Sequence, residues 1–168
     1  MQPDRVDTTM ESRGMTLLEI CVALAVIGIL AALSVNPMKN YLRRLDFRNS
    51  CQNIKRLIQT AQSKAMANPN LHIGVYFDLG ATPNKAFLFE DKINPAAYNY
   101  DGSGDSPYLQ PEVLKKKSVF RALPGYPDEV VFRGDGSAWK SFKIVVTDGT
   151  LNDTLDVLAS TGRVRLGK

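Results

Sequence analysis

The chain has 168 residues, of which 44% are hydrophobic and 23% charged, and its formal net charge is +4. This length allows one domain plus one further segment, and the composition is that of a folded protein rather than a disordered chain. The mild excess of positive charge permits anionic partners but does not indicate one.

An apolar run from Met15 to Val35 contains a single charged side chain, that of Glu19. A helix of this length spans about 31 Å at about 1.5 Å per residue, which matches the hydrocarbon core of a bilayer. The run lacks the polar stripe with a period of 3.6 residues that a helix on a soluble core would carry. We therefore expect a membrane-spanning helix over residues 15–37.

Glu19 and Gly14 give the run a more specific meaning. A carboxylate in hydrocarbon costs about 2.5 kcal/mol or more, so an acid inside a membrane needs a partner. Cleavage after Gly14 would make Met15 the N-terminus and place its amine one helical turn from Glu19. A carboxylate in the first turn also favours the positive end of the helix dipole. We expect Glu19 to pair with this amine, in its own chain or in a neighbour.

The hexapeptide GMTLLE at residues 14–19 resembles the class III signal of type IV pilins and type II secretion pseudopilins. Gly28 also falls where that family often has glycine. The resemblance implies that residues 1–14, starting at Met1 or at Met10, are a leader that prepilin peptidase removes. It also implies N-methylation of Met15 and a role for Glu19 in assembly. An ordinary signal anchor, in which Glu19 is incidental, is the alternative.

The resemblance further implies a location and a set of partners. The chain would cross the bacterial inner membrane once, with its C-terminal domain in the periplasm, and then enter a pilus or pseudopilus. Its partners would be the prepilin peptidase and other pilins or pseudopilins in a helical filament. Whether the filament is a pilus or part of a type II secretion system stays open, as does a tip or shaft position.

Residues 38–68 are expected to continue the helix in amphipathic form. Asn36-Pro37 predicts a kink or a local break, and Asn68-Pro69-Asn70 predicts the end of the helix. The residues expected on the apolar face are Met38, Tyr41, Leu42, Leu45, Cys51, Ile54, Leu57, Ile58, Ala61 and Ala65. The basic residues of the other face are Lys39, Arg43, Arg44, Arg48, Lys55, Arg56 and Lys64. That face is either simply solvated, or in contact with lipid headgroups or with acids of neighbouring subunits.

Beyond the helix the hydrophobic period changes to two, which predicts a β domain over residues 69–168. The expected strands are Leu71–Leu79, Lys85–Asp91, Ser118–Ala122, Glu129–Arg133, Phe142–Thr147, Thr154–Ser160 and Arg163–Leu166. Short connections without helices favour antiparallel pairing. The predicted fold class is α+β, with a long N-terminal helix packed on an antiparallel β-sheet domain. Two segments, residues 130–138 and 160–165, resemble the GspH/FimT minor pilins.

The sequence GRVR at residues 162–165 supports a second interpretation. Arg163 and Arg165 would lie on one side of a strand, about 7 Å apart, where they could bridge adjacent DNA phosphates. The resemblance to FimT-type minor pilins of natural transformation implies DNA binding through this motif. The alternative is an edge strand in which the arginines only prevent aggregation.

Other residues give weaker signals. Asp101, Ser103 and Asp105 resemble the start of a calcium loop, and the alternative is a polar turn. Catalysis is not expected, because His72 is the sole histidine and no nucleophile or metal motif accompanies it. Cys21 and Cys51 are too far apart along one helix to form a disulfide. The chain is therefore expected to be a structural assembly protein, not an enzyme, with no cofactor other than a calcium ion at that loop.

Overall fold

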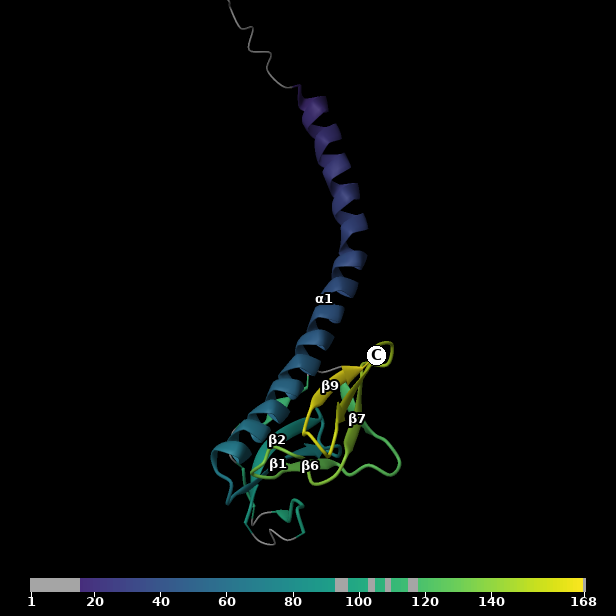
Figure 1. The fold of residues 1–168 in the computed structure, drawn as a ribbon. Coiled ribbons are helices and arrows are strands. Elements are labelled where there is room, and N and C mark those ends of the chain that lie inside the picture. The colour runs from purple at the N-terminus through teal and green to yellow at the C-terminus, as the bar shows by residue number, and fades with distance from the viewer. Residues whose placement is uncertain (1–15, 93–96, 103–104, 108–109, 115–117, 168) are drawn as a thin grey trace, which may run out of the picture. The chain divides into compact units, whose positions relative to one another are not determined.

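The computed structural model describes residues 16–92, 97–102, 105–107, 110–114 and 118–167. Within these ranges one helix, α1 (Leu17–Ala67), precedes nine strands (Figure 1). The strands are β1 (His72–Asp78), β2 (Lys85–Asp91), β3 (Ser106–Pro107), β4 (Glu112–Val113), β5 (Val119–Ala122), β6 (Glu129–Phe132), β7 (Phe142–Thr147), β8 (Asn152–Val157) and β9 (Val164–Gly167). The chain divides into two compact units, Met1–Tyr41 and Leu42–Lys168. A long N-terminal helix with antiparallel strands confirms the predicted α+β class.

The helix α1 continues through Pro37. Proline in a helix interior removes one backbone hydrogen bond and normally kinks or ends the helix. Of the two outcomes expected at Asn36-Pro37, the structure therefore excludes the break. The helix ends at Ala67, before Asn68 and Pro69, as predicted.

The apolar residues in the second half of α1 lie on two different faces of the helix. Buried apolar residues are Phe47, Cys51, Ile54, Leu57, Ile58, Ala61 and Ala65, whereas Met38, Tyr41 and Leu42 are 55%, 59% and 48% exposed. Cys51 follows Leu45 by six positions, which is a rotation of about 600°, or about 240° beyond one full turn, so the two side chains point to different faces. The expectation of one continuous apolar stripe is therefore wrong for its first two turns, and the expected set did not include the buried Phe47.

The strands form two antiparallel sheets. Sheet A has the order β3-β2-β1-β6, with β4 also paired to β2, and sheet B has the order β5-β7-β8-β9. The predicted bounds of β2 and β7 are confirmed, and the other expected strands differ by one to three residues at an end. The two-residue strands β3 and β4 were not predicted, because strands this short leave no periodic pattern.

One hydrophobic core joins α1 with the inner faces of both sheets. It contains Ile54 and Ile58 from the helix, Val75 from sheet A and Ile144 from sheet B. Phe77 links the sheets, since its ring stacks on Phe142 at 4.8 Å and meets Phe120 edge-on at 5.1 Å. Cys51 lies in this core, Cys21 is exposed, and both are free thiols.

Candidate functional site

The first turn of α1 carries Glu19, the residue expected to guide assembly. The Glu19 N–H donates to the Thr16 carbonyl at 3.0 Å and to the Thr16 hydroxyl at 3.3 Å. Thr16 therefore caps the helix, and Glu19 lies three residues later, where a carboxylate favours the positive end of the helix dipole. Its side chain is exposed and so remains available to a partner outside the chain. The expected cleavage site, Gly14 and Met15, lies outside the described residues.

The side chains from Leu17 to Leu33 are all exposed. Leu18, for example, is 72% exposed, and a Cβ placed on Gly28 would meet no atom within 4 Å. Among the described residues, α1 is the one helix long and apolar enough to cross a membrane, and none of its apolar window is buried within the chain. Exposed apolar surface of this extent is typical of an interaction surface, either with a membrane or with other proteins.

Arg43, which was expected on the basic outer face, instead binds the turn between β7 and β8. Its Nε donates to Asp148 Oδ2 at 2.8 Å, and its terminal nitrogen donates to the Asp148 carbonyl at 3.0 Å. Asp148 Oδ1 also accepts the N–H groups of Thr150 and Leu151. Burial raises the pKa of the Asp148 carboxyl, but these hydrogen bonds outweigh it and lower the pKa to about 2. The pair fastens residue 43 of the helix to sheet B.

The two segments that resemble the GspH/FimT minor pilins meet on the helix. Gln62 Nε2 donates to the Gly136 carbonyl at 2.7 Å and to the Thr161 carbonyl at 3.3 Å. Gly162 has a φ of 61°, and a Cβ there would collide with the Gly136 carbonyl oxygen. Glycine is therefore required at position 162 by the close approach of two turns.

Arg163 and Arg165 lie at the edge of sheet B. Both are exposed, whereas Val164 between them is buried, so the two arginines share the outer face of the sheet. Arg165 is opposite Asp156 of β8, which in turn is opposite Lys143 of β7. The arginines make no ion pair with any described residue. An exposed basic edge of this kind fits either an anionic partner or a strand protected against aggregation.

The residues of the expected calcium loop are only partly described. Asp105 is buried, and its two oxygens accept the N–H groups of Lys92 at 2.9 Å and Asp101 at 2.7 Å. Asp101 is exposed and accepts a hydrogen bond from the Asn99 amide. Ser103 lies outside the described residues. In the part of the chain that is described, no three His, Cys, Asp or Glu side chains are grouped to hold a metal ion, so the calcium site stays a prediction.

Segment 97–102 covers the outer face of sheet A, the face turned away from α1. A second apolar cluster lies there, made of Phe87, Phe89 and Val131 with Tyr76, Tyr98 and Tyr100 packed against it. The Phe89 ring crosses β1 at Gly74, where a Cβ would approach the ring to 2.7 Å. The Tyr100 N–H donates to Glu129 Oε2 at 2.7 Å. This contact ties the segment to β6.

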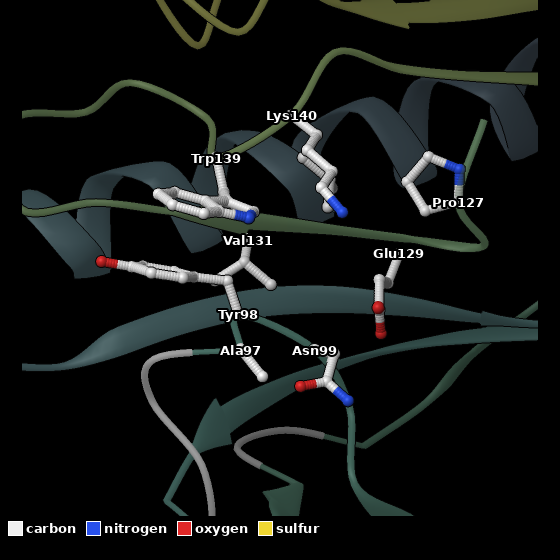
Figure 2. Close-up of a pocket in the computed structure, with 9 residues that line it drawn as sticks. Ala97, Tyr98, Asn99, Pro127, Glu129, Val131, Trp139 and Lys140 are labelled. Carbon is white, nitrogen blue, oxygen red and sulfur yellow. The ribbon is translucent and has the colours of Figure 1, made fainter. Parts of the chain in front are cut away.

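Tyr98 and Trp139 form the edge of a small cavity (Figure 2). Their rings stack at 4.0 Å, the Arg133 guanidinium lies 4.4 Å from the Trp139 ring, and His72 lies 4.5 Å from Tyr98. Tyr98 has a φ of 52°, which a tyrosine adopts only when tertiary contacts hold it. Glu129 reaches the cavity from the opposite side (Figure 2). The volume is about 50 Å³, which admits water but no substrate.

These contacts assign packing roles to the residues that could otherwise indicate catalysis. His72 is engaged with the Tyr98 ring, and Trp139 lies between aromatic and guanidinium neighbours. Burial raises the pKa of the Glu129 carboxyl, and the nearby acids raise it further against the effect of the Tyr100 N–H. No nucleophile with an adjacent base occurs among the side chains described around this cavity, so the geometry does not support a catalytic centre.

A long N-terminal helix whose second half packs on antiparallel sheets is the architecture of pilin-like proteins, and the chain has this fold. Neither a known protein family nor a curated protein matches the sequence. Among solved structures, the chain is similar to the minor pseudopilin EpsH from the type 2 secretion system of Vibrio cholerae. The two share 13% sequence identity with a TM-score of 0.53, over 72% of this chain and 95% of that one. At this identity the likeness concerns the fold.

Proposed function

We propose that the chain is a structural minor subunit of a type IV pilus or type II secretion pseudopilus. One observation carries the proposal: a single helix combines an exposed apolar first half, with Glu19 in its first turn, and a second half buried in a pilin-like domain. The apolar side chains of the first half are not buried within the described chain, so other molecules must cover them. The similarity to a minor pseudopilin supports an assembly role rather than an enzymatic one.

The proposed mechanism is physical. The apolar run holds the subunit in the bacterial inner membrane, with the β domain in the periplasm. Prepilin peptidase cuts after Gly14, and the new amine of Met15 becomes N-methylated. On extraction from the membrane, the apolar surfaces of neighbouring helices replace lipid, and Glu19 pairs with the amine of a neighbouring subunit. The outward residues Met38, Tyr41 and Leu42 extend this surface beyond Pro37.

Two variants separate processing from assembly. Gly14→Val should leave the full-length precursor uncut, which gel mobility and N-terminal sequencing would detect. Glu19→Val should insert in the membrane and be processed, yet should be missing from sheared filaments or from cross-linked assemblies. Asp46→Asn removes an exposed acid of the same helix outside the first turn, and it should assemble normally. Normal incorporation of the Glu19→Val subunit would refute the assembly role of Glu19.

The exposed arginines at the edge of sheet B favour a second candidate, a minor pilin that binds DNA for uptake. Arg163 and Arg165 share one face, so two guanidiniums could contact successive phosphates. Arg163→Gln/Arg165→Gln in the full chain should weaken DNA retention in a gel shift and reduce its salt dependence. Lys55→Gln/Arg56→Gln removes the same charge from the helix as a control. Equal retention by both double variants would dismiss the arginine pair.

A further inference from the structure

A groove lies between α1 and the start of β8, within the unit formed by residues 42–168. Its volume is about 390 Å³, and its lining consists of Arg44, Phe47, Arg48, Leu151, Asn152 and Asp153. Phe47 is 4% exposed and belongs to the hydrophobic core, so the floor of the groove is apolar and firmly held. The Leu151 N–H is bound by Asp148, the residue that Arg43 fastens to the helix. The groove is therefore built on fixed elements.

The groove separates two positive charges from one negative charge. Arg44 and Arg48 lie one turn apart on α1 and are exposed, and neither has an ion pair or a hydrogen bond with its side chain among the described residues. Arg43 differs, because Asp148 occupies its guanidinium. Asp153 lies on the β8 side next to Cys51, and no ion pair links it to either arginine of the groove. Two guanidiniums and a carboxylate therefore line the same cavity without neutralising one another directly.

We propose that this groove binds the zwitterionic headgroup of phosphatidylethanolamine, with its phosphate between Arg44 and Arg48 and its ammonium toward Asp153. Guanidinium groups bind phosphate oxygens through paired, charge-assisted hydrogen bonds, and an ammonium donates readily to a carboxylate. Phe47 and Leu151 provide an apolar floor for the carbon atoms between the two charges. The inference rests on the membrane insertion proposed above.

The position of the groove in the sequence places it within reach of a lipid surface. Arg44 follows Val35, the last residue of the apolar run, by nine residues. Basic side chains just outside a membrane span are attracted to phosphate headgroups. A purely anionic headgroup would pair with the arginines but leave Asp153 without a cation, whereas a purely cationic headgroup would be repelled by the two arginines. The charge pattern thus favours a headgroup that carries both signs.

The test uses the full-length chain in detergent micelles, titrated separately with phosphatidylethanolamine, phosphatidylcholine and phosphatidylglycerol and analysed by native mass spectrometry. The unsubstituted chain should retain phosphatidylethanolamine in preference to the other two lipids. Arg44→Gln/Arg48→Gln should weaken that retention by roughly tenfold or more, since charge-assisted hydrogen bonds are lost. Asp153→Asn should abolish the preference for phosphatidylethanolamine over phosphatidylglycerol. Lys55→Gln/Arg56→Gln, which removes the same charge from the helix outside the groove, should leave retention unchanged.

Equal retention of the three lipids, or unchanged retention after loss of both groove arginines, would overturn the proposal. Preference for phosphatidylglycerol that is independent of Asp153 would overturn it as well, because the site would then be a simple anion site. Carbonate extraction of cell membranes tests the membrane anchor separately. A chain released by carbonate would contradict the proposed membrane anchor itself, whereas an anchored chain without lipid preference would contradict the groove alone.

Discussion

Breaking the link between Arg43 and Asp148 should destabilise the β domain in a pH-dependent way. Asp148→Asn keeps the shape of the side chain but removes its charge, and Arg43→Gln removes only the guanidinium. The side chain of Asp148 is 2% exposed and that of Arg43 is 35% exposed. The pair is therefore partly screened by solvent, whereas the hydrogen bonds from Thr150 and Leu151 are retained after the Arg43 substitution.

The magnitude follows from the pKa of Asp148, which is lowered from 3.8 to about 2. A shift of this size corresponds to about 2.4 kcal/mol if taken in full, and solvent screening at Arg43 reduces it to about 1–2 kcal/mol. The folded chain releases this proton more readily than the unfolded chain. The stabilisation is therefore complete above about pH 4 and is lost as the pH falls toward 2.

Urea unfolding of the full-length chain in detergent, followed by Trp139 fluorescence, measures this effect. Between pH 5 and pH 2 the unsubstituted chain should lose about 1–2 kcal/mol of unfolding free energy through this group, and Asp148→Asn should not. At neutral pH, Arg43→Gln should have a lower free energy of unfolding than Arg44→Gln. The Arg44→Gln variant is the control, because it removes an unpaired arginine from the next position and should change the free energy of unfolding by less than about 0.5 kcal/mol. Equal stability of the Arg43 and Arg44 variants, or an unchanged acid dependence in Asp148→Asn, would refute the reasoning.

Three further outcomes are expected. Gly162→Ala should lower the free energy of unfolding by more than about 1 kcal/mol, because residue 162 has a positive φ and its Cβ would collide with the Gly136 carbonyl. Gly149→Ala, which also has a positive φ but open space around it, should lower the free energy of unfolding by less in the same urea titration. Burial raises the pKa of the Cys51 thiol to about 12, with Asp153 adding to the effect, so iodoacetamide should modify Cys51 only after unfolding, as peptide mass mapping would show. Burial also raises the pKa of the Glu129 carboxyl, so the folded chain loses stability as the pH rises through that pKa. Glu129→Gln should therefore have a higher melting temperature than the unsubstituted chain at neutral pH, but not at pH 4.

The strands were predictable where burial on one face or both imposes a regular pattern. In β7, Phe142, Ile144 and Val146 are buried and alternate with half-buried residues, so the period of two marks both ends of the strand. In β8 the alternation begins with polar residues, and the prediction was displaced by up to three residues. The alternation of buried and exposed residues depends only on neighbouring positions, so it can be recognised in the sequence alone.

Contacts between distant residues were not predictable. The Asp148-Gly149 pair is typical of a turn, but nothing near Asp148 in the sequence marks Arg43, 105 residues earlier, as its partner. Tyr98 and Trp139 stack across the outer face of sheet A for the same reason, although each is an ordinary aromatic residue in its own segment. Such pairs depend on the register of the sheets, which a single sequence does not reveal.

The change of face along α1 explains how one helix can serve two environments. Before residue 45 the apolar side chains Met38, Tyr41 and Leu42 point away from any partner in the chain, and from Phe47 onward the apolar side chains face the β domain. If the apolar residues had stayed on one face along the whole of α1, that face could not both pack on the β domain and remain exposed at Met38, Tyr41 and Leu42. Arg43 lies at this transition, and its bond to Asp148 fixes the rotation of the helix against sheet B. In the proposed subunit, this arrangement would let the β domain pack on the helix while Met38, Tyr41 and Leu42 stay exposed for lipid or for neighbouring helices.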